Sequence, residues 1–136
     1  MLIKMTLNEV SKTLERLNAL GNLHLPTSLG FAIAKNQKML IEELQIAEAQ
    51  RQEKLKQCAK IDENGNIVED TETGNAEFKD DKAKKEFLKF YTELYGTETE
   101  FNINAVEMNV LDLCEKESYD NLTVDNINTL LFMLEE

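Results

Sequence analysis

The chain has 136 residues, the usual size of one domain, and we expect a single domain over residues 1–136. It carries 26 acidic and 15 basic residues, and this net charge of −11 disfavours direct binding to nucleic acid or to an anionic membrane. No apolar run reaches the 18 residues of a membrane-spanning helix. The only cysteines, Cys58 and Cys114, form neither a disulfide framework nor a metal motif, so we expect buried free thiols in a reducing compartment.

A short helix is the first predicted element. Thr6 and Glu9 have the three-residue spacing of a capping box, which marks the start of a helix. One apolar stripe follows at steps of four and three, formed by Val10, Leu14, Leu17 and Leu20. Gly21 stands at the C′ position, where we expect a left-handed residue to end the helix.

The second predicted helix starts at Pro26, which suits a first turn, and runs to about Lys60. Its apolar seam has heptad-like steps with polar interruptions, and consists of Ile33, Gln37, Leu40, Leu44, Ala47, Arg51, Leu55 and Cys58. At 1.5 Å per residue this helix is roughly 50 Å long, more than one compact domain needs. We therefore expect the seam to pack against another helix of the same chain or of a second copy, and we predict a homodimer through the second helix.

Residues 61–74 differ in character because they are acidic, polar and rich in turn formers. Asn64-Gly65 predicts a tight turn in which both residues tolerate positive φ, so we expect a small β-hairpin or an exposed loop. The segment 61–77 is expected to be mobile. A calcium loop of the EF-hand type does not fit when Asp62 is counted as its first position. Gly65 then stands at position four instead of six, and Thr73 stands at position twelve, which needs an acid.

Residues 78–95 predict a third helix with one apolar face, made of Ala83, Phe87, Phe90, Tyr91 and Leu94. Gly96 follows at the expected C-cap. Residues 99–105 alternate as in a short strand, and 106–114 are ambiguous. Thr123 is the expected N-cap of a last helix that carries Ile127, Leu130, Leu131 and Leu134. The fold class we predict is α-rich α+β: a long helical hairpin with short N- and C-terminal helices and a small β-hairpin or strand element.

The sequence offers little catalytic chemistry. His24 is the only histidine and has no nucleophile elbow near it, so we expect a surface or connector residue. The five glycines are scattered and form no phosphate-binding loop. We expect no catalytic, cofactor-binding or metal-binding residues, no cofactor, and a protein that is not an enzyme.

Two features can serve as an interaction surface. One is the hairpin tip, defined as Asp62, Glu63, Asn64 and Gly65. The other is a lysine stripe on the third helix, opposite its apolar face, formed by Lys82, Lys85 and Lys89. Each has a simpler interpretation that we favour. The tip is then a plain connector, and the stripe is a solvated helix face whose lysines pair with Asp80, Asp81 and Glu86.

Several short motifs follow one another along the chain in this order: Leu25-Pro26, Ala34-Lys35-Asn36, Asp62-Glu63-Asn64-Gly65-Asn66, Glu100-Phe101-Asn102-Ile103 and Leu131-Phe132-Met133-Leu134-Glu135-Glu136. With these motifs the chain resembles a family of uncharacterised small proteins encoded by tailed phages and prophages of Gram-positive bacteria. The resemblance implies a phage gene product that acts in the cytoplasm of an infected bacterial host or in a virion. It transfers no functional residues.

Three functions stay open at this stage. The first is a non-catalytic phage accessory protein that binds a host or phage protein, including an inhibitor of a bacterial antiviral defence system that uses an acidic surface to fill a nuclease groove. The second is a virion or tail structural or assembly protein. The third is a sequestering binder of a small nucleotide signal, with Arg51 and the lysine stripe gathered at its site.

Overall fold

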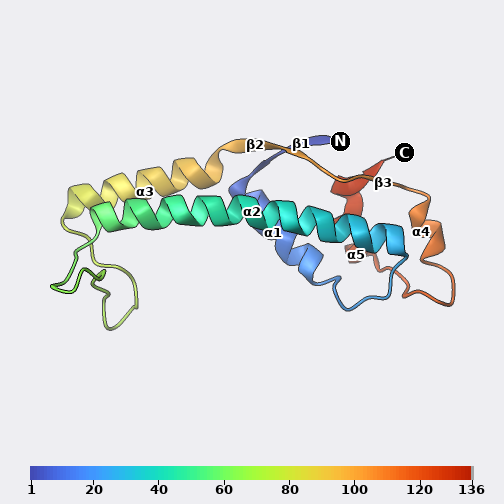
Figure 1. Cartoon of the computed structure of the whole chain (residues 1–136), viewed down its shortest axis with the longest axis horizontal. Helices are drawn as coiled ribbons and strands as arrows, with labels where there is room; N and C mark the ends of the chain where they lie inside the picture. The colour runs from blue at the N-terminus through green and yellow to red at the C-terminus, as the bar shows by residue number, and fades with distance from the viewer. Residues whose placement is uncertain (136) are drawn as a thin grey trace. The chain divides into compact units, whose positions relative to one another are not determined.

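The computed structural model describes residues 1–135, so Glu136, the last residue of the C-terminal motif, lies outside the described residues. The fold is α-rich α+β, as predicted (Figure 1). It divides into two compact units, unit 1 (Met1–Leu44 with Glu98–Glu136) and unit 2 (Gln45–Thr97). The boundary falls inside one helix, and a single domain over residues 1–136 stays a prediction. Within residues 1–135, no helix combines the length and the apolar character that a membrane crossing requires.

Helix α1 (Leu7–Asn18) begins as predicted. Thr6 Oγ1 accepts a hydrogen bond from Glu9 N at 3.2 Å, and Glu9 Oε1 accepts one from Thr6 N at 3.3 Å. The predicted end is wrong, because Ala19 is the C-cap and Gly21 does not have a positive φ. Successive right-handed turns, such as Leu20 N to Leu17 O at 3.0 Å, satisfy the last carbonyls and bury Leu20, so no left-handed residue is needed.

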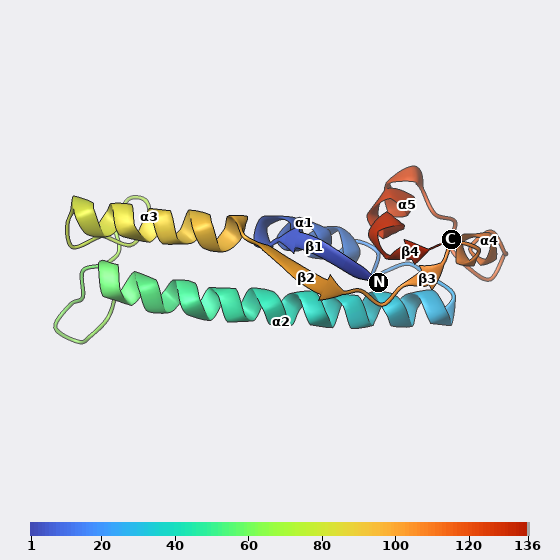
Figure 2. The ribbon, with the colours of Figure 1, turned by 90° about the horizontal axis from the view of Figure 1, so that it is seen from above.

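Strands β1 (Leu2–Thr6) and β2 (Glu98–Asn102) form an antiparallel sheet in unit 1, and both views show them side by side (Figures 1 and 2). The strand near residue 99 was predicted, and its buried Phe101 and Ile103 confirm the alternation. Its partner β1 was not predicted. The sheet therefore joins the first residues of the chain to a segment far along the sequence.

The C-terminal part of unit 1 holds the remaining short elements: β3 (Val106–Glu107), α4 (Val110–Leu113), α5 (Val124–Leu130), the 3₁₀ helix η1 (Leu131–Met133) and β4 (Leu134–Glu135). Thr123 caps α5 as predicted. The predicted placement of Leu131 and Leu134 on that helix is wrong, because the chain tightens into η1 and then pairs β4 in parallel with β3. This extended end buries Leu134 in the core.

Helix α2 (Thr27–Cys58) follows Pro26 directly and contributes to both units. Five of its eight seam side chains are buried within the chain: Ile33, Leu40, Ala47, Leu55 and Cys58. The seam therefore packs within the same chain, which was one of the two expected arrangements. A homodimer through this helix stays a prediction. The one buried polar side chain among residues 1–135 is Asn36, which is 0% exposed.

In unit 2, the last turns of α2 and helix α3 (Asp81–Gly96) form the predicted antiparallel hairpin (Figure 2). Its small core contains Leu55, Cys58, Ala59 and Phe87. The helix starts later than predicted, because Phe78 pairs with Ala59 in a β-bridge and Asp80 supplies the N-cap. Gly96 is the last helical residue rather than a C-cap, and Thr97 takes that position.

Candidate functional site

The predicted hairpin tip is present in unit 2 as a tight turn. Asp62 Oδ1 accepts hydrogen bonds from Asn64 N at 2.8 Å and from Asn66 N at 2.9 Å, and a single bridge joins Ile61 to Ile67. Gly65 has a φ of 81° and Asn64 does not have a positive φ, so only the glycine uses the conformation that both residues tolerate. Because the carboxylate of Asp62 holds the backbone of the turn, its first role is structural.

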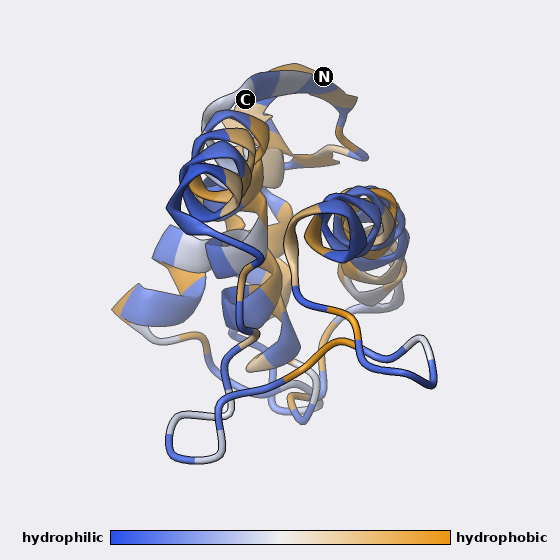
Figure 3. Cartoon of the chain, turned by 90° about the vertical axis from the view of Figure 1, so that its left-hand side faces the viewer, coloured by the Kyte–Doolittle hydropathy of each residue, from blue (hydrophilic) through white to orange (hydrophobic). Residues whose placement is uncertain are grey.

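A second tip of similar design was not predicted. Asp70 Oδ1 accepts from Glu72 N at 2.7 Å and from Thr73 N at 3.2 Å, and Gly74 has a φ of 72°. Figure 3 draws the ends of both loops in blue and white, without the orange of hydrophobic residues. The sequence did hold a signal, since an Asp is followed after a few residues by Gly-Asn in each tip.

A closed ring of three backbone hydrogen bonds joins the two tips to the helices. Lys60 N donates to Glu77 O, Glu77 N donates to Val68 O, and Val68 N donates to Lys60 O, at 2.8, 2.8 and 2.9 Å. An ion pair between Lys60 Nζ and Glu77 Oε2 at 3.8 Å lies beside this ring. The segment between the helices is thus a hydrogen-bonded junction with two turns, and its predicted mobility stays a prediction.

The lysine stripe lies on the exposed face of α3, where Lys82, Lys85 and Lys89 are all exposed. The predicted ion pairs are wrong, because none of these lysines has a carboxylate within 4.0 Å among residues 1–135. Asp80 instead accepts a hydrogen bond from Ala83 N at 2.7 Å as the helix cap. Within the same residues, no hydrogen bond or ion pair joins the stripe to the hairpin tip.

Unit 2 also contains a groove that sequence reasoning missed. It has a volume of about 580 Å³ and lies between α2, the segment 67–78 and α3. Its apolar lining comprises Leu55, Ile67, Ala76, Phe78, Phe87 and Leu88. Its polar lining includes Arg51, Gln52, Glu69, Asn75 and Lys84. We call this feature the unit 2 groove. Neither the hairpin tip nor the lysine stripe contributes a residue to it.

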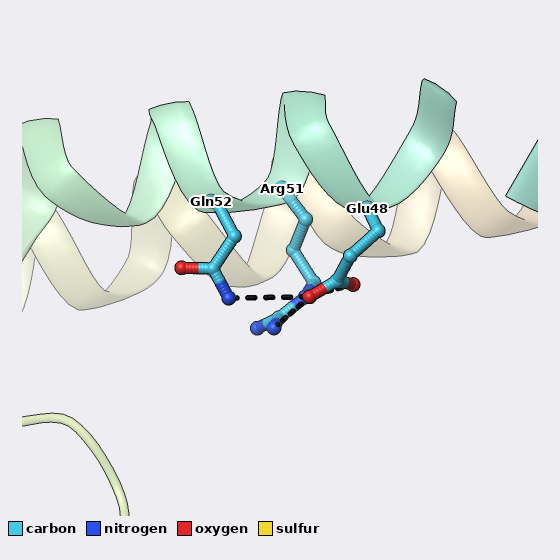
Figure 4. A network of polar contacts seen from close by, with 3 residues as sticks. All are labelled: Glu48, Arg51 and Gln52. Carbon is cyan, nitrogen blue, oxygen red and sulfur yellow. Dashed lines mark hydrogen bonds and ion pairs between the residues drawn. The ribbon is translucent and has the colours of Figure 1, made fainter. Parts of the chain in front are cut away.

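Arg51 is held in a fixed position on α2 (Figure 4). Its Nε and Nη2 donate to the two carboxylate oxygens of Glu48 at 2.9 and 2.6 Å, and Gln52 Nε2 donates to the same carboxylate at 3.1 Å. These hydrogen bonds from Arg51 and then Gln52 lower the pKa of Glu48 from 4.5 to about 2. Glu48 therefore stays ionised at any ordinary pH and keeps the guanidinium oriented.

A row of aromatic rings in unit 2 begins at Phe78, just before α3, and continues along that helix. The ring centroids of Phe78 and Phe87 are 5.5 Å apart, those of Phe87 and Tyr91 6.3 Å, and those of Tyr91 and Tyr95 4.6 Å in a stacked pair. Burial raises the pKa of the Tyr95 hydroxyl, and the negative charge of Glu48 adds to this effect. The row gives this side of α3 a rigid apolar surface next to the groove.

Unit 1 carries most of the negative charge. It has 14 acidic and 6 basic residues, a net of −8, whereas unit 2 has 12 and 9, a net of −3. The charge concentrates in residues 98–135, which we call the acidic segment. Its nine carboxylates are all exposed: Glu98, Glu100, Glu107, Asp112, Glu115, Glu117, Asp120, Asp125 and Glu135. Lys116 is its only basic residue, and none of the nine has an ion-pair partner within 4.0 Å among residues 1–135.

The other residues singled out in the sequence have ordinary surroundings. His24 is an exposed connector residue whose backbone N donates to Asp120 Oδ2 at 2.6 Å, as expected for a connector. Cys58 and Cys114 are buried free thiols, as predicted. Within residues 1–135, no three His, Cys, Asp or Glu side chains are grouped as a metal site.

Comparison with known proteins adds no relative. No protein-family model, no curated protein and no solved structure matches this chain. The phage resemblance therefore rests on the order of sequence motifs alone.

Proposed function

We propose that this chain is a non-catalytic binding protein whose acidic segment occupies a basic site on a protein partner. The observation that carries the proposal is the acidic segment itself, with nine exposed carboxylates and one lysine. None of the nine has an ion-pair partner among residues 1–135, and all except Asp120, which accepts a hydrogen bond from His24 N, have no side-chain hydrogen bond there, so they can pair with lysine and arginine side chains of another surface. Such complementarity raises association rates and selects partners by charge.

The identity of the partner is the finer part of the proposal and rests on the resemblance. We propose a host or phage protein in an infected bacterium. A nuclease of an antiviral defence system is one suitable target, because its nucleic-acid groove is basic and can accept an acidic surface. A virion or tail component is the alternative from the same resemblance. A binder of a small nucleotide is a separate alternative, and the unit 2 groove is the feature that favours it.

The first test identifies a partner and then removes the charge. Tagged protein is used to capture partners from uninfected and infected host cells, and each captured protein is purified for binding measurements. The variant E98Q/E100Q/E115Q/E117Q removes four charges from the acidic segment. The matched control, E53Q/E63Q/E86Q/E93Q, removes four exposed charges from unit 2 and leaves the same net charge.

The proposal predicts a partner whose affinity falls steeply between 50 and 300 mM salt, because exposed charges are screened. We expect the unit 1 variant to weaken binding at least about tenfold, as for the loss of several interfacial charge pairs, and the unit 2 control to change it much less. Salt-independent binding, or equal loss in both variants, would refute the role of the acidic segment. Recovery of phage structural proteins alone, together with presence in purified particles, would favour the virion alternative.

A further inference from the structure

We propose that the unit 2 groove is a binding site for a small planar aromatic anion, a ligand that carries one ring system and one carboxylate or phosphate. The groove lies wholly in unit 2, so this proposal is independent of the acidic segment in unit 1. Its volume of about 580 Å³ is within the usual range of small-molecule sites, about 300–1,000 Å³.

The apolar part of the groove suits an aromatic ring. Phe78 and Phe87 line it, with ring centroids 5.5 Å apart and rings tilted by 42°, and aromatic side chains of this kind pack favourably against a further ring. Leu88 lines the same groove and is 48% exposed. A bound ring would remove this leucine from water, which favours binding.

The charges of the groove favour an anion. Its lining contains two cations, Arg51 and Lys84, and one carboxylate, Glu69. Arg51 is already paired with Glu48 from outside the lining, so Lys84 is the lining cation without an ion pair among residues 1–135. Both cations belong to helices, Arg51 to α2 and Lys84 to α3, whereas Glu69 belongs to the segment 67–78.

Arg51 is suited to this role because its position is already fixed. Its Nε and Nη2 are bound to Glu48, while its Nη1 makes no hydrogen bond within residues 1–135. Lys84 likewise has no carboxylate within 4.0 Å among these residues. The groove thus presents donors on a preorganised guanidinium and one flexible ammonium, and Gln52 and Asn75 add side-chain amides.

The test is a titration of the full chain with three probes, followed by methyl and amide NMR signals. The probes are 1-naphthoate, adenosine 5′-monophosphate and the cationic analogue 1-naphthylmethylamine. We expect saturable shifts of the Leu55, Ile67 and Leu88 methyl signals with at least one anion, and at least threefold weaker binding of the cation. Saturation by the nucleotide would assign the anion to a phosphate, and saturation by naphthoate alone would assign it to a carboxylate.

Matched variants locate the site. Lys84→Ala should weaken anion binding about threefold, the effect of one exposed charge pair, without weakening the cationic probe. Lys85→Ala is the control, because Lys85 is a neighbouring exposed lysine of α3 that does not line the groove. Leu88→Glu should weaken anion binding at least about tenfold, by adding a like charge at an exposed position.

Three results would overturn the proposal: no saturable shift at these methyl groups with either anion, equal affinity for the cationic probe, or equal effects of Lys84→Ala and Lys85→Ala. Because the charge variants of the acidic segment leave the groove intact, they should bind these probes like the unmodified chain. A failure of either proposal is therefore distinguishable from a failure of the other.

Discussion

Replacement of Asn36 by alanine is the most direct test of how unit 1 is held together. The Asn36 amide is fully buried, and its Oδ1 accepts from Asn104 N at 2.8 Å while its Nδ2 donates to Asn104 O at 3.0 Å. Two weaker contacts complete the site, from Asn104 Nδ2 to Oδ1 at 3.1 Å and from Nδ2 to Met133 Sδ at 3.6 Å. One side chain thus satisfies both backbone groups of a residue 68 positions away.

Asn36→Ala leaves both backbone groups of Asn104 without these partners. Each unsatisfied group costs about 1–3 kcal/mol, so the two together predict a loss of about 2–6 kcal/mol in the free energy of unfolding. This is a large share of the roughly 5–15 kcal/mol that stabilises a domain. Asn104→Ala is the matched control, because it removes only the side-chain bond to Asn36 Oδ1 and should cost about 0.5–1.5 kcal/mol.

The assay is urea unfolding followed by circular dichroism, together with hydrogen exchange at the Asn104 amide. Asn36→Asp adds a pH test. Burial should raise the pKa of this new carboxyl above its unfolded value, so the variant should be most stable at low pH and lose stability as pH rises through the folded pKa. If Asn36→Ala costs no more than Asn104→Ala, the argument from satisfied backbone groups is refuted.

Three further predictions concern single positions. Gly65→Ala should lower the free energy of unfolding by about 1–2 kcal/mol, because Gly65 has a φ of 81°. Gly96→Ala should raise it by about 0.4–1 kcal/mol, because Gly96 is helical and an added Cβ there meets no atom within 4 Å. Thermal unfolding of both variants checks the opposite signs. Glu48→Gln should lower the free energy of unfolding by only about 0.5 kcal/mol at pH 7, because the Glu48 side chain is 49% exposed and solvent screens its pair with Arg51. The pKa of Glu48 is about 2 in the folded chain and 4.5 in the unfolded chain, so the difference between the two proteins should be complete above pH 4.5 and vanish as pH falls towards 2. Cys58 and Cys114 are 3% and 2% exposed, so each should react with a thiol reagent about a hundredfold more slowly than a free thiol. This rate corresponds to a free energy of local opening of about 3 kcal/mol. Fast labelling of either cysteine would show that its unit opens easily.

Local signals in the sequence predicted the helices well. Thr6 with Glu9 and Thr123 as an N-cap are interactions within three residues, so their spacing alone indicates them. Glycines were less informative, since Gly21 and Gly96 do not have positive φ whereas Gly65 and Gly74 do. A helix can end in right-handed turns when a following side chain is buried, and only the tertiary structure shows this.

Long-range features were not predictable from local pattern. Strand β1 has only five residues, which is too short for its alternation of side chains to indicate a strand. Its pairing, for example of Ile3 with Phe101, joins residues far apart along the chain, and no local pattern indicates it. The unit 2 groove combines residues of α2, of the segment 67–78 and of α3, and no spacing rule joins three such segments. The acidic segment differs, because its composition was readable in the sequence as soon as charge was counted by region rather than over the whole chain.

The predicted homodimer through α2 can be argued from the surfaces that the helix leaves available. Its seam is occupied within the chain, so a dimer would have to use the outer face, whose large exposed apolar side chains are Phe31, Ile41 and Ile46. At about 100° per residue, Phe31 and Ile46 lie about 60° apart, and Ile41 lies about 80° away from Phe31 on the other side, so the three form a broad arc rather than one narrow stripe. Lys35 Nζ lies 4.6 Å from the Phe31 ring centroid.

A continuous stripe is what two helices need in order to pack side by side. Light scattering at high micromolar concentration decides the question. A mass of 15.6 kDa would refute the homodimer, and twice that mass would support it. For a dimer, Phe31→Lys and Ile46→Lys should restore the monomer mass if the outer face of α2 forms the interface. A dimer that persists in both variants would place its interface on another surface.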